Sequence, residues 1–189
     1  IEKIKQLTEK RNSPIVMNYQ INTKCLDKEH WQRSKEGGGR NLGEACHVYD
    51  VFTFLAGAEV KKIAALSIGN SNEIFGRNEN FSATISFEDG SIGNLTYTSL
   101  GSTVYPKEIF HIFCDQSVIY LNNYKTLKIF GPSEEKYSTD ASEKGHLKEI
   151  ETFLRSVRGD CDWPIPLWQQ IQATEIALTV EDQINGKEK

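Results

Sequence analysis

The chain has 189 residues, 38% of them hydrophobic, and a formal net charge of −4 at pH 7. This length and composition predict one globular domain with a sizeable core. The acidic balance argues against a surface for nucleic acid or anionic membranes, and no apolar run reaches the roughly 18 residues of a transmembrane helix. The four cysteines are widely separated, without a Cys-x-x-Cys pair, which suits a reducing cytoplasm.

The first 39 residues predict a helix, a strand and a long connection. Residues 1–11 carry apolar side chains at helical spacing, and the Asn-Ser-Pro sequence at 12–14 ends this short amphipathic helix. Residues 15–22 are rich in β-branched and aromatic side chains, which favours a strand. Residues 23–39 are polar, and a loop of this length in a compact domain is often a binding loop or a lid.

Three consecutive glycines at positions 37–39 precede an amphipathic run. Glycines allow a sharp turn or a close approach of the backbone to a ligand. The apolar spacing that follows predicts a helix that begins near residues 42–44 and ends at Gly57. His47 then lies in its first or second turn, where the helix N-terminus disfavours imidazolium. A neutral imidazole at this position is able to exchange a proton near pH 7.

The remainder of the chain predicts strands followed by two helices. Alternating apolar residues at 81–87 indicate a strand with one buried face, and Asp89-Gly90 predicts a tight hairpin. A polar loop is expected at 71–77. The other expected strands lie at 60–68, 92–98, 108–114, 117–121 and 126–130, and the helices at 146–157 and 167–184. The fold class is therefore α+β, with an open, mostly antiparallel sheet of about six strands and helices packed on one face.

Several segments together resemble a known family. They are Asn18-Tyr19-Gln20-Ile21-Asn22, His30-Trp31, residues 36–50, residues 87–93, Pro106-Lys107-Glu108, Lys144-Gly145-His146 and Pro164-Ile165-Pro166. Over nearly the whole chain they resemble the C-terminal domain of the Gfo/Idh/MocA family of NAD(P)-dependent sugar oxidoreductases. The sequence Gly-Glu-Ala-Cys-His at 43–47, followed by Asp50, is similar to a subgroup from polysaccharide-biosynthesis loci, some of whose members are fused to an alcohol-dehydrogenase-like module.

The resemblance implies that residues 1–189 form the substrate-binding and oligomerisation domain of a longer enzyme. The family's N-terminal Rossmann domain carries a Gly-x-Gly-x-x-Gly turn and a catalytic lysine in a Glu-Lys-Pro motif, and this chain contains neither. NAD or NADP would be held mainly by that domain, so the chain by itself is expected to be inactive. The implied partners are a sugar or nucleotide sugar, the Rossmann domain, and further copies of the chain that meet through the open sheet face. The alternative is a non-catalytic carbohydrate-binding or oligomerisation module that retains the fold.

The resemblance also assigns His47 to catalysis. In the family this histidine bonds to the reacting sugar hydroxyl and assists the lysine of the other domain. The alternative is a histidine that caps the helix. Many family members have an aspartate four residues earlier, where this chain has Gly43. Glu44 is then expected to orient the imidazole or to bind a sugar hydroxyl, or else only to complement the helix dipole. Asp50, three residues after His47, could bond to the backbone at the helix start or to His47 itself, and the resemblance implies a structural role.

Other candidates surround this helix start. Arg40 is suited to bind a carboxylate or a phosphate, or else is a solvated loop arginine. His30 and Trp31 are candidates for the wall of a sugar pocket, with a core aromatic as the alternative for Trp31. Asn22 ends the first strand, from which the family projects a substrate contact. Two of the glycines are weak candidates for the nicotinamide side of the cofactor site, Gly38 and Gly39. No metal site is expected, because the Glu44-x-x-His47 pair supplies too few ligands.

Overall fold

The computed structural model describes residues 1–34, 36–69, 75–132, 134–142 and 144–186. Its helices are α1 (Glu2–Thr8), α2 (Cys46–Ala56), α3 (His146–Val157) and α4 (Leu167–Ile184). Its strands are β1 (Val16–Asn22), β2 (Val60–Ser67), β3 (Phe81–Phe87), β4 (Ile92–Thr98), β5 (Glu108–Cys114), β6 (Ser117–Asn122), β7 (Thr126–Phe130) and β8 (Glu135–Ser138). The polar loop expected at 71–77 falls partly outside the described residues.

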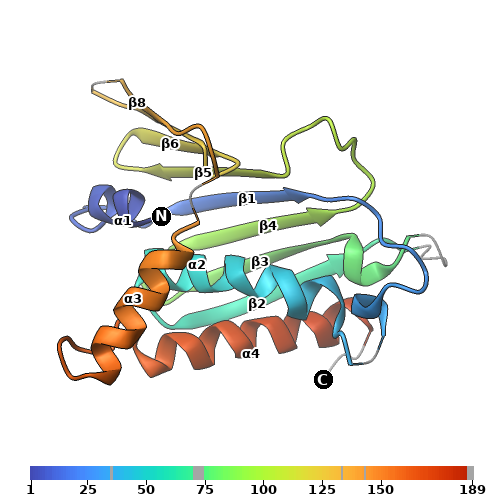
Figure 1. Ribbon diagram of the computed structural model, residues 1–189. Helices are drawn as coiled ribbons and strands as arrows, with labels where there is room; N and C mark the ends of the chain where they lie inside the picture. The colour runs from blue at the N-terminus through green and yellow to red at the C-terminus, as the bar shows by residue number, and fades with distance from the viewer. Residues whose placement is uncertain (35, 70–74, 133, 143, 187–189) are drawn as a thin grey trace.

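The strands form one sheet in the order β2-β3-β4-β1-β5-β6-β7-β8 (Figure 1). β1 lies in its centre, parallel to β4 and antiparallel to β5, and the other pairings are antiparallel. The α+β class is confirmed, but the described sheet is mixed and has eight strands rather than about six. β8 was missed because it is short, polar and exposed along its whole length, so it has no alternation of apolar residues.

One face of the sheet packs against α2 and α4 (Figure 1). The inward residues of β3 are buried at every second position, as the alternating pattern predicts. Close packing continues at β4, where a Cβ atom on Gly93 would lie 2.5 Å from the Phe52 ring of α2. The helix that carries His47 is therefore fixed tightly against the centre of the sheet.

The long C-terminal helix α4 also protects the β2 edge of the sheet. The Gln183 amide oxygen accepts from the Ala65 backbone N–H at 2.6 Å, and its nitrogen donates to the Ile63 carbonyl at 3.2 Å. Gln172 accepts from the Val60 N–H at 2.8 Å in the same way. These bonds satisfy backbone groups that an exposed edge leaves open, and they hold α4 in register with the sheet.

Helix α3 differs from the other helices. It projects away from the sheet, and none of its residues is buried (Figure 1). Its apolar side chains include Leu147, 71% exposed, and Val157, 64% exposed. Within the described part of the chain, no helix combines the length and the apolar character needed to cross a membrane.

Candidate functional site

His47 lies at the start of α2, where a π-helical turn over Asn41–Ala45 leads directly into the α-helix. The side chain is exposed and faces a cavity of about 720 Å³. The walls come from the glycine loop and α2, from β1 and β5, and from the start of α3. The polar and charged residues that line the cavity beside His47 include Arg40, Glu44, Asp50, Tyr19, Tyr124 and Lys144.

The carboxylate of Glu44 is the central charge on one wall of this cavity. It pairs with the Arg40 guanidinium at 2.8 Å and accepts hydrogen bonds from the Lys107 ammonium and the Tyr97 hydroxyl. Burial opposes ionisation of Glu44, but the bonds from Lys107 and Tyr97 and the nearby positive charges outweigh it and lower its pKa. Burial and the Glu44 charge raise the pKa of Tyr97, which stays a neutral donor. Glu44 is thus an ionised carboxylate that already has three donors.

The Arg40 side chain is held from two sides and is only 11% exposed. Besides Glu44, it donates to the Lys24 carbonyl at 3.3 Å. Its Nε atom is buried and has no hydrogen-bond partner among the described residues. A buried donor without a partner is costly, so this atom is a candidate contact for a bound ligand.

A pair of tyrosines and an ion pair also line this cavity. The Tyr19 hydroxyl donates to the Tyr124 hydroxyl at 3.0 Å, and burial raises the pKa of both groups. Lys144 pairs with Glu108 at 3.2 Å and lies 5.2 Å above the centre of the Tyr124 ring. These contacts tie the segment before α3 to the sheet. The sequence left Tyr19 open between a substrate contact and a sheet residue, and Lys144 entered only as part of a segment that resembles the family, because this lining joins residues far apart in the chain.

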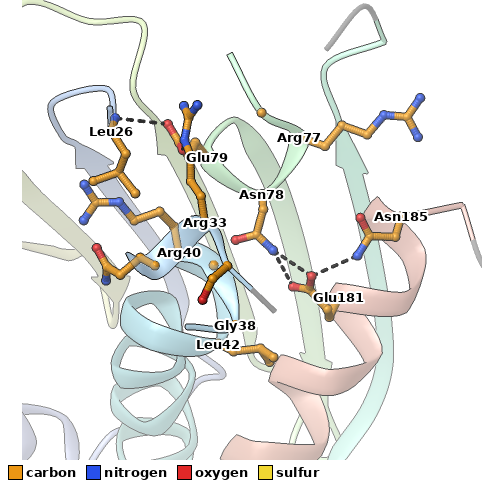
Figure 2. Close-up of a pocket in the computed structure, with 14 residues that line it drawn as sticks. Leu26, Arg33, Gly38, Arg40, Leu42, Arg77, Asn78, Glu79, Glu181 and Asn185 are labelled. Atoms are coloured by element: carbon orange, nitrogen blue, oxygen red, sulfur yellow. Dashed lines mark hydrogen bonds and ion pairs between the residues drawn. The ribbon is translucent and has the colours of Figure 1, made fainter. Parts of the chain in front are cut away.

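A second cavity of about 620 Å³ is lined by Gly38 and Gly39 of the glycine loop together with Arg33, Asn78 and Glu181 (Figure 2). There the Arg33 Nε atom pairs with Glu79 at 2.6 Å, and Asn78 donates to Glu181 of α4 at 2.6 Å. Gly39 has a φ of +73°, and a Cβ atom on it would lie 2.2 Å from the Asn78 side chain. The packing of the loop against its own chain therefore already requires glycine at 39. The cofactor contact predicted for the glycines stays a prediction.

Asn41 connects the glycine loop to α4 and is completely buried. Its backbone N–H donates to the Asn78 side chain at 2.8 Å, and its own amide donates to the Ala177 carbonyl at 2.8 Å and to Glu181 at 2.9 Å. The Tyr49 hydroxyl donates to its amide oxygen at 2.8 Å. This network fixes the start of the π-helical turn, and hence the positions of the residues that face the His47 cavity. Sequence reasoning did not identify it, because a single asparagine carries no local signal.

The structure separates the predicted site residues into two groups. His47, Arg40 and Glu44 face one cavity. His30 instead caps a short 3₁₀ helix by accepting from the Gln32 backbone N–H at 3.3 Å, and Trp31 beside it is 66% exposed. His30 and Trp31 are not among the described residues that line the His47 cavity. The same is true of Asn22, Gly38 and Gly39.

Asn22 lies in a smaller hollow at the end of β1 together with Lys24 and Lys107. Its amide donates to the Ser102 carbonyl at 2.8 Å, while its buried amide oxygen has no partner among the described residues. Lys107 joins this hollow to the His47 cavity, because its ammonium reaches Glu44. The substrate contact predicted for Asn22 therefore remains a prediction about a neighbouring hollow.

Asp50 lies one helical turn after His47 and faces the same cavity. Burial raises the pKa of its carboxyl, and positive charge on His47 opposes that shift. Among the described residues, no three His, Cys, Asp or Glu side chains are grouped closely enough to hold a metal ion.

A family model described as "Oxidoreductase family, C-terminal alpha/beta domain" (GFO_IDH_MocA_C) matches residues 8–187. A search of curated proteins returned no match.

Solved structures with the same fold are numerous. UDP-N-acetylglucosamine 3-dehydrogenase from Acidithiobacillus ferrooxidans superposes with a TM-score of 0.79 at 16% identity, over 99% of this chain and 58% of that one. The WlbA dehydrogenase from Bordetella pertussis, in complex with NADH and UDP-GlcNAcA, gives 0.69 at 14% identity, over 97% and 56%. An oxidoreductase from Thermotoga maritima gives 0.70 at 23% identity, over 98% and 56%. The chain therefore spans somewhat more than half the length of these structures.

Proposed function

The chain belongs to the Gfo/Idh/MocA oxidoreductase family as its C-terminal α/β domain, and on this premise we propose that it binds the substrate of an NAD(P)-dependent dehydrogenase. The substrate is a sugar or nucleotide sugar whose hydroxyl is oxidised, or whose carbonyl is reduced. Two similar structures, the UDP-N-acetylglucosamine 3-dehydrogenase and WlbA in complex with UDP-GlcNAcA, support this substrate class. The observation that carries the proposal is the cavity that His47, Arg40, Tyr19 and Tyr124 line together.

Each side chain has a role that suits its surroundings. His47 is exposed to the cavity and is not needed by the core, so its imidazole is available to bond to the reacting hydroxyl and to accept its proton. The buried Arg40 Nε atom suits an acidic group of the substrate, either a uronic carboxylate or a diphosphate. Trp31 and His30 do not line the cavity, so a sugar ring would contact them only if the ligand extended beyond it.

The cofactor would be carried mainly by a nucleotide-binding domain outside this chain. When bound, its nicotinamide supplies the acceptor or donor of a hydride at the sugar carbon. Gly38 and Gly39 line the other cavity and not the His47 cavity, so their contact with the nicotinamide stays a prediction. The four cysteines are free thiols.

The apolar face of α3 is the surface that such a domain would cover. A groove of about 440 Å³ between α2 and α3 shares His47 and Asp50 with the catalytic cavity and continues along Phe153 and Trp163. Contiguous exposed apolar surfaces mark interaction sites. The open sheet face, where Phe113 is 40% exposed, remains the expected contact between copies of the chain.

Titration calorimetry of the chain with UDP-GlcNAc and with UDP-GlcNAcA tests substrate binding. Arg40→Gln is expected to weaken UDP-GlcNAcA alone, by about tenfold or more, if the guanidinium binds its carboxylate, and to weaken both compounds if it binds the diphosphate that they share. A folded chain that binds neither compound would refute the proposal.

In an enzyme that contains both domains, His47→Ala is expected to lower kcat by about 10² to 10⁴ with a small change in sugar affinity. If the protein that contains both domains binds sugar but shows no turnover, the non-catalytic module is favoured instead.

A further inference from the structure

The two tyrosines that line the His47 cavity are joined hydroxyl to hydroxyl. Tyr19 of β1 is buried, and its ring packs against the Phe110 ring with 4.9 Å between the centroids. Its hydroxyl donates to the Tyr124 hydroxyl at 3.0 Å. A phenol carries one proton and accepts through its lone pairs. Tyr124 therefore accepts a hydrogen bond from the core and retains its own proton for another acceptor.

Tyr124 lies in the turn between β6 and β7, and this turn is anchored to β5. The Asn123 N–H donates to the Glu108 carbonyl at 2.8 Å, and the Glu108 N–H donates to the Asn123 amide oxygen at 2.9 Å. Tyr124 has a φ of +55°, a left-handed conformation that glycine or asparagine adopts more readily than a bulky residue. Backbone conformations of this cost cluster at functional sites, where a particular side chain is needed.

The Tyr124 ring is held in place, and its hydroxyl is a neutral donor. The ring packs against the core, and the Lys144 ammonium, which pairs with Glu108 at 3.2 Å, lies 5.2 Å from its centroid. Burial raises the pKa of Tyr124, which keeps the phenol protonated near neutral pH. Among the described residues, the hydroxyl has Tyr19 as its hydrogen-bond partner, and Tyr19 is the donor of that bond. The Tyr124 proton thus has no acceptor from the described part of the chain.

We propose that Tyr124 is a substrate-binding residue whose hydroxyl donates to an oxygen of the sugar in the His47 cavity. Tyr19 is its positioning residue, because the bond that it donates directs the Tyr124 proton away from the core. The inference rests on the function proposed above. The sugar is the part of the ligand concerned, because Tyr124 shares its cavity with His47, which is proposed to meet the reacting hydroxyl.

The test is titration calorimetry of the chain with UDP-GlcNAc, using single and double variants of the two tyrosines. Tyr124→Phe keeps the ring and removes the donor, so it should raise the Kd by about three- to tenfold, the value of one neutral hydrogen bond. Tyr19→Phe should raise it by a smaller factor, because the Tyr124 hydroxyl loses the bond that directs it. The double variant should bind no more weakly than Tyr124→Phe alone, because Tyr19 acts only through Tyr124.

Tyr120→Phe is the matched control. It removes the same atom from a tyrosine of β6 whose neighbours Ile119 and Leu121 are buried, so Tyr120 lies on the opposite face of the sheet from the core. Its hydroxyl accepts from Asn122 at 3.0 Å, and it does not line the cavity. Its Kd should stay within about twofold of wild type, and circular dichroism verifies that each variant is folded.

The outcomes separate this inference from the proposed function. If the folded wild-type chain does not bind UDP-GlcNAc, the proposed function fails and the inference fails with it. If wild type binds and Tyr124→Phe has no larger effect than Tyr120→Phe, the function stands and the inference is wrong. Additive effects of Tyr19→Phe and Tyr124→Phe would refute the positioning role of Tyr19. UDP alone should not respond to Tyr124→Phe, and an equal loss for UDP would refute the contact with the sugar.

Discussion

Replacement of Glu44 by glutamine tests whether its carboxylate holds the glycine loop, α2 and the sheet together. The substitution keeps the size of the side chain and removes its charge. Tyr97 retains an acceptor in the new amide, whereas Arg40 and Lys107 lose a counter-charge. The effect on the free energy of unfolding therefore depends on how well each cation is solvated.

The two cations contribute unequally. The side chain of Lys107 is 47% exposed, so its pair is worth at most about 1 kcal/mol. That of Arg40 is 11% exposed, and a cation left in a nearly buried place without its partner is costly. We expect Glu44→Gln to lower the free energy of unfolding by about 1.5 to 3 kcal/mol near neutral pH.

The pH dependence provides a second check on the same variant. The pKa of Glu44 is lowered in the folded protein, so its stabilisation is complete above the pKa of the unfolded chain, about 4.3. It is lost as the pH falls through the folded value. The difference between wild type and Glu44→Gln should therefore be largest near neutral pH and shrink below about pH 4.

Urea unfolding followed by circular dichroism at several pH values measures both effects. Glu88→Gln is the matched control, because its pair with Lys61 spans 3.7 Å between side chains that are 57% and 63% exposed. It should change stability by less than about 0.5 kcal/mol. A loss for Glu44→Gln no larger than for this control, or one that does not shrink on acidification, would refute the reasoning.

The remaining predictions concern packing near the site, each measured by urea unfolding. Gly93→Ala should cost about 1 to 3 kcal/mol, because its methyl group would overlap the Phe52 ring; an effect near zero would mean that α2 shifts freely. Asn41→Ala should cost about 2 to 4 kcal/mol, because buried partners on α2 and α4 lose their bonds; a smaller loss would imply that water replaces the amide. Gly39→Ala should cost more than about 1 kcal/mol and shift amide resonances throughout the loop, since its φ is positive and a side chain blocks the space. Gly76→Ala, with open space around it and a negative φ, should stay within about 0.5 kcal/mol, and a larger loss there would discount the other glycine results.

Local patterns in the sequence predicted most of the secondary structure. The helix predicted to end at Gly57 does so, with that glycine in the left-handed region at φ +67°. The Asp89-Gly90 turn joins β3 and β4 as expected. These predictions are confirmed because apolar spacing, glycine and turn chemistry act over a few residues. Such signals were missing from β8.

The placement of His47 at the start of α2 was likewise determined by the sequence alone, through the glycine run and the apolar face of the helix. Only the tertiary structure decided what surrounds it. Glu44 meets Tyr97, 53 residues later, and Lys107, 63 residues later, while Asn41 meets Glu181 of α4 at a separation of 140. A local pattern records which face of an element is buried, but not which distant side chain meets it there. The binding of the Glu44 carboxylate by Arg40, Lys107 and Tyr97 depends on such meetings, and it arises only when the strands assemble around the helix.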